Sequence, residues 1–192
     1  MRAGMELLLI RHAPTAGNLA RRYLGRTDEG LCPEGIALAK EAAGRMPPAD
    51  AVYISPMRRC RETAELLFPG REPVAVPGLQ ETDFGAFEYK SYEELKTDPA
   101  YCAWLDSGGE GPIPGGEDKK TVERRVLAAL DGLLESLPET GRAALVVHGG
   151  TIMTILAARG LPERSYYDWQ VKTCRGFAVV PENGKLRVLR AL

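Results

Sequence analysis

Two short apolar runs, each of which ends in a histidine, constrain the fold of this chain more than any other feature. Residues 7–10 are followed directly by Arg11 and His12, and residues 143–147 are followed by His148. Short apolar runs closed by a turn signal are typical of strands that are buried on both faces. In open α/β sheets, function gathers beyond the carboxyl ends of such strands. The only two histidines of the chain are therefore expected to meet at one site; the alternative is that they are unrelated.

Helical and extended patterns alternate along the rest of the chain. Residues 15–30 form a polar, glycine-bearing loop with room for one helical turn, and a loop of this length directly after a strand is usually functional. Ser55 and Pro56 provide an N-cap and a first helical residue for the helix that follows the second strand. The alternation predicts a three-layer α/β/α sandwich with a mostly parallel sheet. The expected helices cover about 33–45, 56–68, 118–137 and 151–159, and the expected strands cover 7–10, 51–54, 74–76, 143–147, 177–181 and 185–189.

Length and charge narrow the class of protein. A chain of 192 residues is expected to form a single domain over residues 1–192, and its net charge of −1 implies neither a nucleic-acid nor a membrane partner. The start of the chain, Met1–Glu6, and the short apolar run after it do not resemble a secretory leader. The cysteines show neither C-x-x-C nor metal-ligand spacing, which favours a cytoplasmic protein and provides no metal site. The four cysteines are Cys32, Cys60, Cys102 and Cys174. No cofactor is expected, and the oligomeric state is not predicted.

The helix expected after Ser55 carries three arginines in its first turns, where the helix dipole disfavours cations. Arg58 and Arg61 each have a glutamate four residues further on, whereas Arg59 has only the neutral Thr63 at that spacing. An unpaired arginine beside the free amides of a helix start favours an anion site. The alternative is that all three arginines are ordinary surface charges.

The segment 79–118 combines acids, aromatic rings and a flexible loop. Three acids surround a glycine turn between Glu81 and Glu88, and six aromatic residues but only two lysines occur over 84–104. Residues 107–116 are rich in glycine and proline. We expect a pocket-forming insertion at about 82–118, although the aromatic residues could equally form a small separate core.

These residues, in this order, resemble the histidine phosphatase superfamily, which also contains the cofactor-dependent phosphoglycerate mutases. The resemblance covers nearly the whole chain and implies a phosphoglycerate-mutase-like fold. It implies that His12 is the phosphorylated nucleophile, that Arg11, Arg59 and His148 clasp the phosphoryl group, and that Glu81 protonates the leaving oxygen. The substrate-binding residues expected beside them are Thr15, Asn18, Gly25 and Gly149.

The sequence departs from the pattern of the superfamily at two places. Ala13-Pro14 follows the Arg-His pair where a glycine and an acid or amide are usual, and Tyr89 follows Glu88 where a glycine is often found. Alanine adds a β-carbon, and proline removes an amide donor and fixes φ. Neither change removes the nucleophile, but both bear on contacts made through those positions.

The implied chemistry suits these residue types. Arginines stabilise the charge of a phosphoryl group in transfer, and they should also lower the pKa of His12, which keeps its attacking nitrogen free near neutral pH. Phosphohistidine is then hydrolysed by water, so the reaction needs no metal.

The expected substrate is a small phosphate ester. Residues 26–28 and 84–88 look most like those of α-ribazole phosphatases of cobalamin assembly, whose ring-bearing substrate suits an aromatic pocket. Two alternatives remain: a phosphoglycerate mutase, and a phosphate-ester binding protein that has lost turnover.

Overall fold

The computed structural model describes residues 4–192 and is built on a seven-stranded sheet with the order β3-β2-β4-β1-β6-β7-β5. The strands are β1 (Gly4–Arg11), β2 (Ala51–Ile54), β3 (Val74–Ala75), β4 (Thr140–Val147), β5 (Gly160–Leu161), β6 (Gly176–Glu182) and β7 (Lys185–Ala191). Strands β3, β2, β4 and β1 are parallel to one another, as are β5 and β7, whereas β6 is antiparallel to both β1 and β7. The prediction of a mostly parallel sheet is confirmed.

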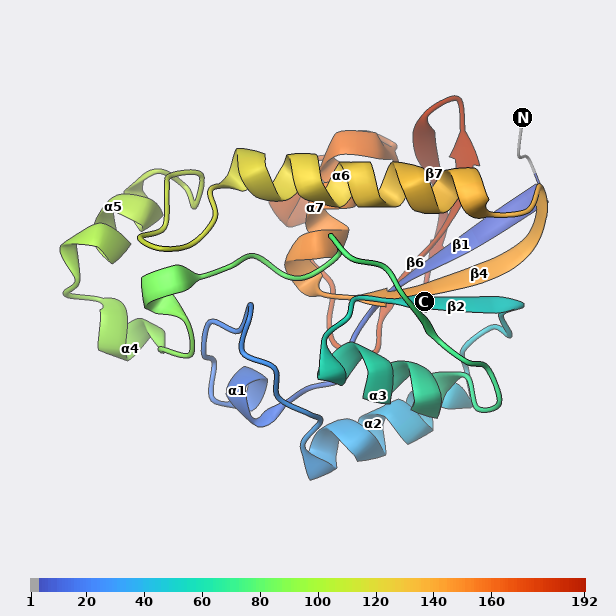
Figure 1. The fold of residues 1–192 in the computed structure, drawn as a ribbon, viewed down its shortest axis with the longest axis horizontal. Coiled ribbons are helices and arrows are strands. Elements are labelled where there is room, and N and C mark those ends of the chain that lie inside the picture. The colour runs from blue at the N-terminus through green and yellow to red at the C-terminus, as the bar shows by residue number, and fades with distance from the viewer. Residues whose placement is uncertain (1–3) are drawn as a thin grey trace.

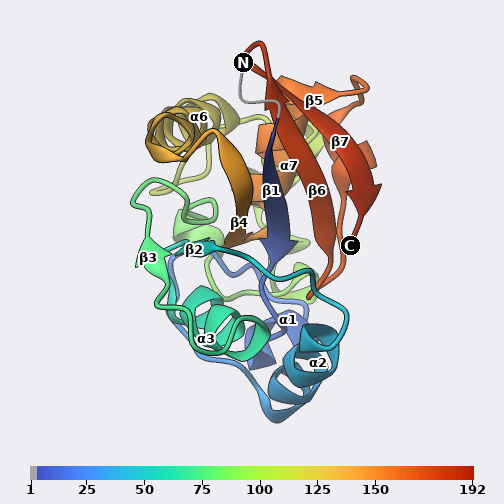
Figure 2. The ribbon, with the colours of Figure 1, turned by 90° about the vertical axis from the view of Figure 1, so that its right-hand side faces the viewer.

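Helices cover both faces of the sheet. Figures 1 and 2 show α2 and α3 on one side of the strands and α6 and α7 on the other. The α-helices are α1 (Ala16–Leu19), α2 (Pro33–Ala43), α3 (Arg58–Leu67), α4 (Tyr92–Leu95), α5 (Pro99–Asp106), α6 (Lys119–Ser136) and α7 (Gly149–Arg159), and the 3-10 helices are η1 (Gly85–Phe87) and η2 (Tyr166–Trp169). The predicted three-layer sandwich is therefore confirmed.

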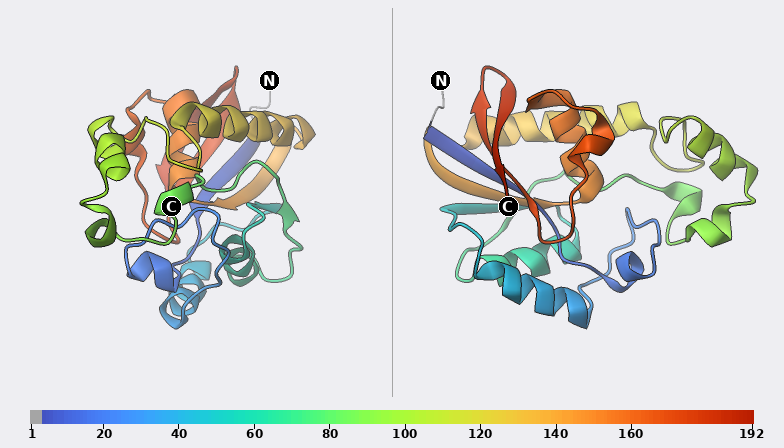
Figure 3. Two further views of the ribbon diagram at one scale, coloured as in Figure 1. Left: turned by 60° about the vertical axis from the view of Figure 1, so that its left-hand side comes forward. Right: turned by 180° about the vertical axis from the view of Figure 1, so that it is seen from behind.

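Helices α4 and α5 lie apart from these layers. They extend away from the sheet, beyond the end at which β1 and β4 finish (Figure 3). Their segment has its own small core, in which Phe87, Leu95, Tyr101 and Ile113 are buried. This placement puts residues between β3 and α6 over the carboxyl edge of the sheet.

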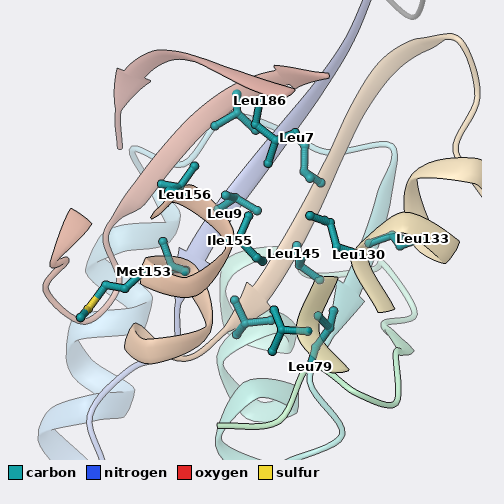
Figure 4. Close-up of a cluster of buried hydrophobic side chains, with 14 of the residues drawn as sticks. Leu7, Leu9, Leu79, Leu130, Leu133, Leu145, Met153, Ile155, Leu156 and Leu186 are labelled. Carbon is teal, nitrogen blue, oxygen red and sulfur yellow. The ribbon is translucent and has the colours of Figure 1, made fainter. Parts of the chain in front are cut away.

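Alternate residues of β1 face opposite helical layers, as expected for a strand buried on both faces. Leu7 and Leu9 belong to the core with α6 and α7 (Figure 4), whereas Leu8 and Ile10 belong to the core with α2 and α3. All four side chains are fully buried. Burial of each contributes about 1.5–3 kcal/mol to folding, and together they hold β1 between the two helical layers.

The prediction that α3 starts at Pro56 with Ser55 as its N-cap is wrong. The helix begins at Arg58 with Met57 as its N-cap, and Met57 makes no side-chain capping bond. Ser55 is fully buried and uses its side chain elsewhere, as described below, so it cannot cap the helix. The two strands expected at 177–181 and 185–189 are present as β6 and β7 and form a C-terminal hairpin. Asn183 and Gly184 both adopt the positive φ that its tight turn requires.

Within residues 4–192, no helix has the length and apolar character needed to cross a membrane. The expectation about the start of the chain rests partly on residues 1–3, which lie outside the described residues.

Candidate active site

The register of two parallel strands brings the histidines together. Arg11 on β1 is paired with Val147 on β4, so His12 and His148 each follow directly beyond the paired ends. The His12 amide also donates to the Val147 carbonyl at 2.9 Å. The ring centroids lie 5.1 Å apart at an interplanar angle of 67°. Two imidazoles separated by more than a hundred residues therefore share one site.

His12 is buried and held by its own backbone neighbour. Its Nδ1 lies 2.7 Å from the Ala13 carbonyl oxygen, which can only accept, so Nδ1 carries the proton. In the neutral ring this leaves the lone pair on Nε2 for nucleophilic attack. Burial, together with the charges of Arg59 and Arg11, holds the pKa of His12 well below its usual value. The direction predicted from the arginines is confirmed, although burial is the larger cause.

Both nitrogens of His148 have protein partners. Nδ1 accepts from Nε of Arg59 at 3.3 Å, and Nε2 lies 2.8 Å from Oγ of Ser55. Because Nδ1 accepts, the proton of the neutral ring is on Nε2, which donates to Ser55. Burial, then Arg59 and His12, hold the pKa of His148 well below its usual value. His148 is also the N-cap of α7, so the positive end of that helix dipole points at the site.

Arg59 is the arginine of α3 that reaches the site. It is fully buried, and its two terminal nitrogens donate to the carbonyls of Gly25 and Thr27 at 2.9 Å each. Arg58 instead points outward, where its side chain is 64% exposed and makes the predicted ion pair with Glu62 at 2.6 Å. The absence of an acidic partner four residues on thus distinguished the buried arginine from the surface one.

Arg11 and Glu81 connect the histidine pair to a cavity of about 570 Å³, which both residues line. Arg11 donates to the Val171 carbonyl at 2.8 Å, and burial lowers its pKa while Glu81 partly compensates. The Glu81 carboxylate accepts from the amides of Thr82 and Gly150 at 2.9 Å each. A β-carbon on Gly150 would overlap Oε1 of Glu81, so a larger residue there would displace the carboxylate from its present position.

The cavity reaches the chain neighbours of the two histidines but not the histidines themselves. Among the described residues its lining includes Arg11 and Gly149, whereas His12, Arg59 and His148 are not part of it. Five aromatic side chains are among the lining residues. These are Tyr23, Phe84, Trp104, Tyr166 and Tyr167. Both interpretations of the aromatic segment therefore hold, because Phe87 and Tyr101 are buried in the small separate core, whereas Phe84 and Trp104 pack against that core and also line the cavity.

Thr15 and Asn18 bind each other. The Asn18 amide donates to Oγ1 of Thr15 at 3.2 Å, and Oδ1 of Asn18 accepts from the Thr15 backbone at 3.2 Å, which is a capping box at the start of α1. Their side chains thus cap α1, a structural role that does not depend on a ligand. Gly25 lies against the Thr82 carbonyl, where a β-carbon would clash.

The unusual Ala13-Pro14 pair is well accommodated. Ala13 is fully buried, and its amide donates to Oγ1 of Thr63 at 2.9 Å. The Pro14 carbonyl accepts from the amide and the thiol of Cys32 at 3.3 Å each. The pair is therefore bonded into the fold, and nothing about it displaces His12.

Two residues that touch the site were not assigned to it from the sequence. Ser55 was interpreted as a helix cap but holds His148, and Thr63 donates to the Arg59 carbonyl at 2.6 Å while accepting from Ala13. In the sequence, only their position near Arg59 could have indicated a place in the site. Serine and threonine hydroxyls also cap helices and bond to carbonyls of the preceding helical turn, so their residue type alone does not indicate a functional role.

Residues 4–192 contain no group of three or more His, Cys, Asp or Glu side chains that could hold a metal ion. The four cysteines are all free thiols, three of them buried.

A family model described as "Histidine phosphatase superfamily (branch 1)" matches residues 7–191, and the chain therefore belongs to this superfamily. Among curated relatives, the adenosylcobalamin/alpha-ribazole phosphatase of Salmonella typhimurium is 30% identical over 192 residues, which cover 92% of this chain and 94% of that protein. A protein of Proteus mirabilis named "Probable phosphoglycerate mutase GpmB" is 31% identical over 179 residues, or 88% of this chain and 82% of that protein.

Solved structures share the fold. A phosphoglycerate mutase from Thermus thermophilus superposes with a TM-score of 0.75 at 36% identity, covering 98% of each chain. An Escherichia coli K-12 protein superposes with a TM-score of 0.87 over 97% of this chain and 95% of its own, but at 23% identity it supports the fold alone.

Proposed function

We propose that this protein is a metal-independent phosphomonoesterase that acts through a phosphohistidine at His12. The observation that carries the proposal is the bond from Nδ1 of His12 to the Ala13 carbonyl, because it presents Nε2 as the nucleophile beside Arg59 and His148. Attack of Nε2 on phosphorus breaks the bond to the ester oxygen, which leaves as the alcohol with a proton from Glu81. Water then attacks the phosphohistidine and gives its proton to Glu81, which releases phosphate and restores His12.

The charges around His12 suit this role. Arg11 and Arg59 would bind the non-bridging oxygens, where the charge of the transferring phosphoryl group lies. An arriving dianion favours protonation of His148, whose Nδ1 can then donate to the phosphoryl group in place of accepting from Arg59. Thr15, Asn18, Gly25 and Gly149 would complete the pocket as the resemblance implies.

For the substrate, we propose an ester with a ring-bearing body, and specifically α-ribazole 5′-phosphate. The name of the Salmonella relative and the aromatic wall of the cavity support this choice. The volume of about 570 Å³ is typical of small-molecule sites. We further propose that residues 1–192 form one domain in which residues 82–118 form the pocket. The protein would act in the cytoplasm, without a nucleic-acid or membrane partner.

A phosphoglycerate mutase is the second candidate, because the Proteus relative carries that name. A mutase must hold a second acidic group of its substrate. Of the described residues, only Arg11 and Lys119 bring cations to the cavity wall, and Lys119 is already paired with Glu110 at 2.5 Å. The small number of cations among the described lining residues favours the phosphatase.

Phosphate release from a panel of esters in excess chelator tests the proposal. We expect turnover of p-nitrophenyl phosphate and α-ribazole 5′-phosphate without added metal, with the higher kcat/KM for the ribazole ester. Interconversion of phosphoglycerates that depends on a bisphosphate primer would instead support the mutase. No release from any ester would leave only the binding protein.

Replacing Glu81 with glutamine should reduce turnover in proportion to how poor the leaving group is. The two amides of Thr82 and Gly150 donate to different oxygens of Glu81, so glutamine, with one acceptor oxygen, keeps one of these bonds and cannot supply a proton. An alkyl phosphate should lose about 10²–10⁴-fold in kcat, and p-nitrophenyl phosphate, whose leaving group needs no proton, much less. The measurement is the rate of the phosphorylation step, and equal losses for both esters would contradict the acid role.

A further inference from the structure

The loop 25–27 lies between the buried arginine of the site and a second carboxylate, Glu88. Its carbonyls accept from Arg59, at Gly25 and Thr27, and the amides of the same two residues donate to Glu88. A single loop thus connects a guanidinium on α3 with a carboxylate that follows η1. None of the chemistry proposed above uses Glu88.

On the side of the arginine, the loop fixes the direction of the guanidinium. Of its five N–H groups, one goes to His148 and one to each of the two loop carbonyls. One N–H on each terminal nitrogen is left for a phosphoryl oxygen. A shift of the loop carbonyls would therefore turn these two donors.

On the side of the carboxylate, a single oxygen of Glu88 accepts from both amides of the loop. Oε1 of Glu88 accepts from Gly25 and from Thr27 at 2.8 Å each. Glu88 itself is anchored, because its amide bonds to the Gly85 carbonyl and its neighbour Phe87 is fully buried in the small core. Amides bonded to a charged acceptor form stronger bonds than those between neutral groups.

The indirect arrangement has an electrostatic advantage. A carboxylate in direct contact with Arg59 would neutralise the positive charge that an incoming phosphate dianion must meet. By gripping the loop, Glu88 can orient the arginine while remaining separated from it by the backbone of Gly25 and Thr27. Glycine is required at position 25 because a β-carbon would clash with the Thr82 carbonyl, beside Glu81.

We propose that Glu88 is a positioning residue that sets the geometry of Arg59 through the loop 25–27, and so controls both phosphate binding and turnover. This inference rests on the proposed function for its effect on turnover, but its effect on phosphate binding does not depend on it.

A double-mutant cycle tests the inference. Glu88→Ala should lower kcat by about 10- to 100-fold, as small misplacements of a positioned group do, and should weaken the binding of inorganic phosphate measured by calorimetry. In an Arg59→Ala background the same change should have almost no further effect on either quantity. Glu88→Gln, whose amide oxygen can still accept both bonds, should restore most of the activity.

Glu94→Ala is the matched control. Glu94 also accepts from a backbone amide, that of Ser91 at 2.9 Å, and lies in the same segment, but its side chain bonds to Ser91 and Arg22 and not to the amides of the loop. It should leave kcat and phosphate binding unchanged in both backgrounds.

The outcomes separate the inference from the proposed function. Equal losses from Glu88→Ala with and without Arg59 would overturn the inference, as would a lower melting temperature with unchanged phosphate binding. Absence of turnover in the unmodified protein would overturn the proposed function, and the phosphate-binding cycle would still decide the role of Glu88. If Glu88→Ala does not fold, Glu88→Asp, which is too short to reach both amides, takes its place in the cycle.

Discussion

Replacement of His12 by alanine is expected to abolish turnover, with a loss of at least about 10⁴-fold in kcat, as found when a covalent nucleophile is removed. Alanine leaves the phosphate site with its arginines but removes the atom that accepts the phosphoryl group. The unmodified protein should form a phosphoenzyme with labelled substrate that is labile to acid, as a phosphohistidine is. His12→Ala should form none.

The second histidine provides the control. His148→Ala should slow phosphorylation and yet still yield the labelled enzyme, because Nε2 of His12 remains presented by the Ala13 carbonyl. A phosphoenzyme in His12→Ala would contradict the assignment of the nucleophile.

The rate of phosphorylation should also depend little on pH near neutrality. Since burial and the two arginines hold the pKa of His12 well below its usual value, protonation of His12 should not slow phosphorylation until the pH is well under 6.5.

The meeting of the two histidines could be predicted from the sequence because it follows from local patterns. Each lies one residue past a buried strand, and parallel strands that pair in register end at the same edge of a sheet. The choice of Arg59 over Arg58 was likewise local, since it depends on which residue stands one helical turn further on. Such features need only the periodicity of single elements.

The details that hold these groups in place could not be predicted. Ser55 has the sequence context of a helix cap, and only the pairing of β2 with β4 shows that it lies beside His148. Besides His148, the partners of the Arg59 guanidinium are carbonyls of a loop, and every residue type supplies a carbonyl, so no side-chain pattern reveals them. Likewise, Thr15 and Asn18 satisfy each other in a capping box whether or not a ligand binds nearby.

The two adjacent arginines of α3 provide the sharpest test of the site, because they differ in burial and not in chemistry. Arg59→Ala is expected to lower kcat by about 10²–10³-fold, since one preorganised donor to a developing oxyanion contributes that much. Arg58→Ala removes an exposed ion pair with Glu62 and should leave kcat nearly unchanged.

Two further measurements make the comparison decisive. The melting temperatures of both variants should be recorded, because Arg59 is fully buried and also bonds to Gly25, Thr27 and His148. Arg59→Lys then separates charge from geometry: an ammonium keeps the charge but cannot present the planar fork, so most of the loss should remain. Equal losses from Arg58→Ala and Arg59→Ala would mean that α3 does not present Arg59 to the phosphoryl group. A fully active Arg59→Lys would show instead that the site needs only a positive charge there. In that case the bonds from Arg59 to the carbonyls of Gly25 and Thr27 would have no part in turnover.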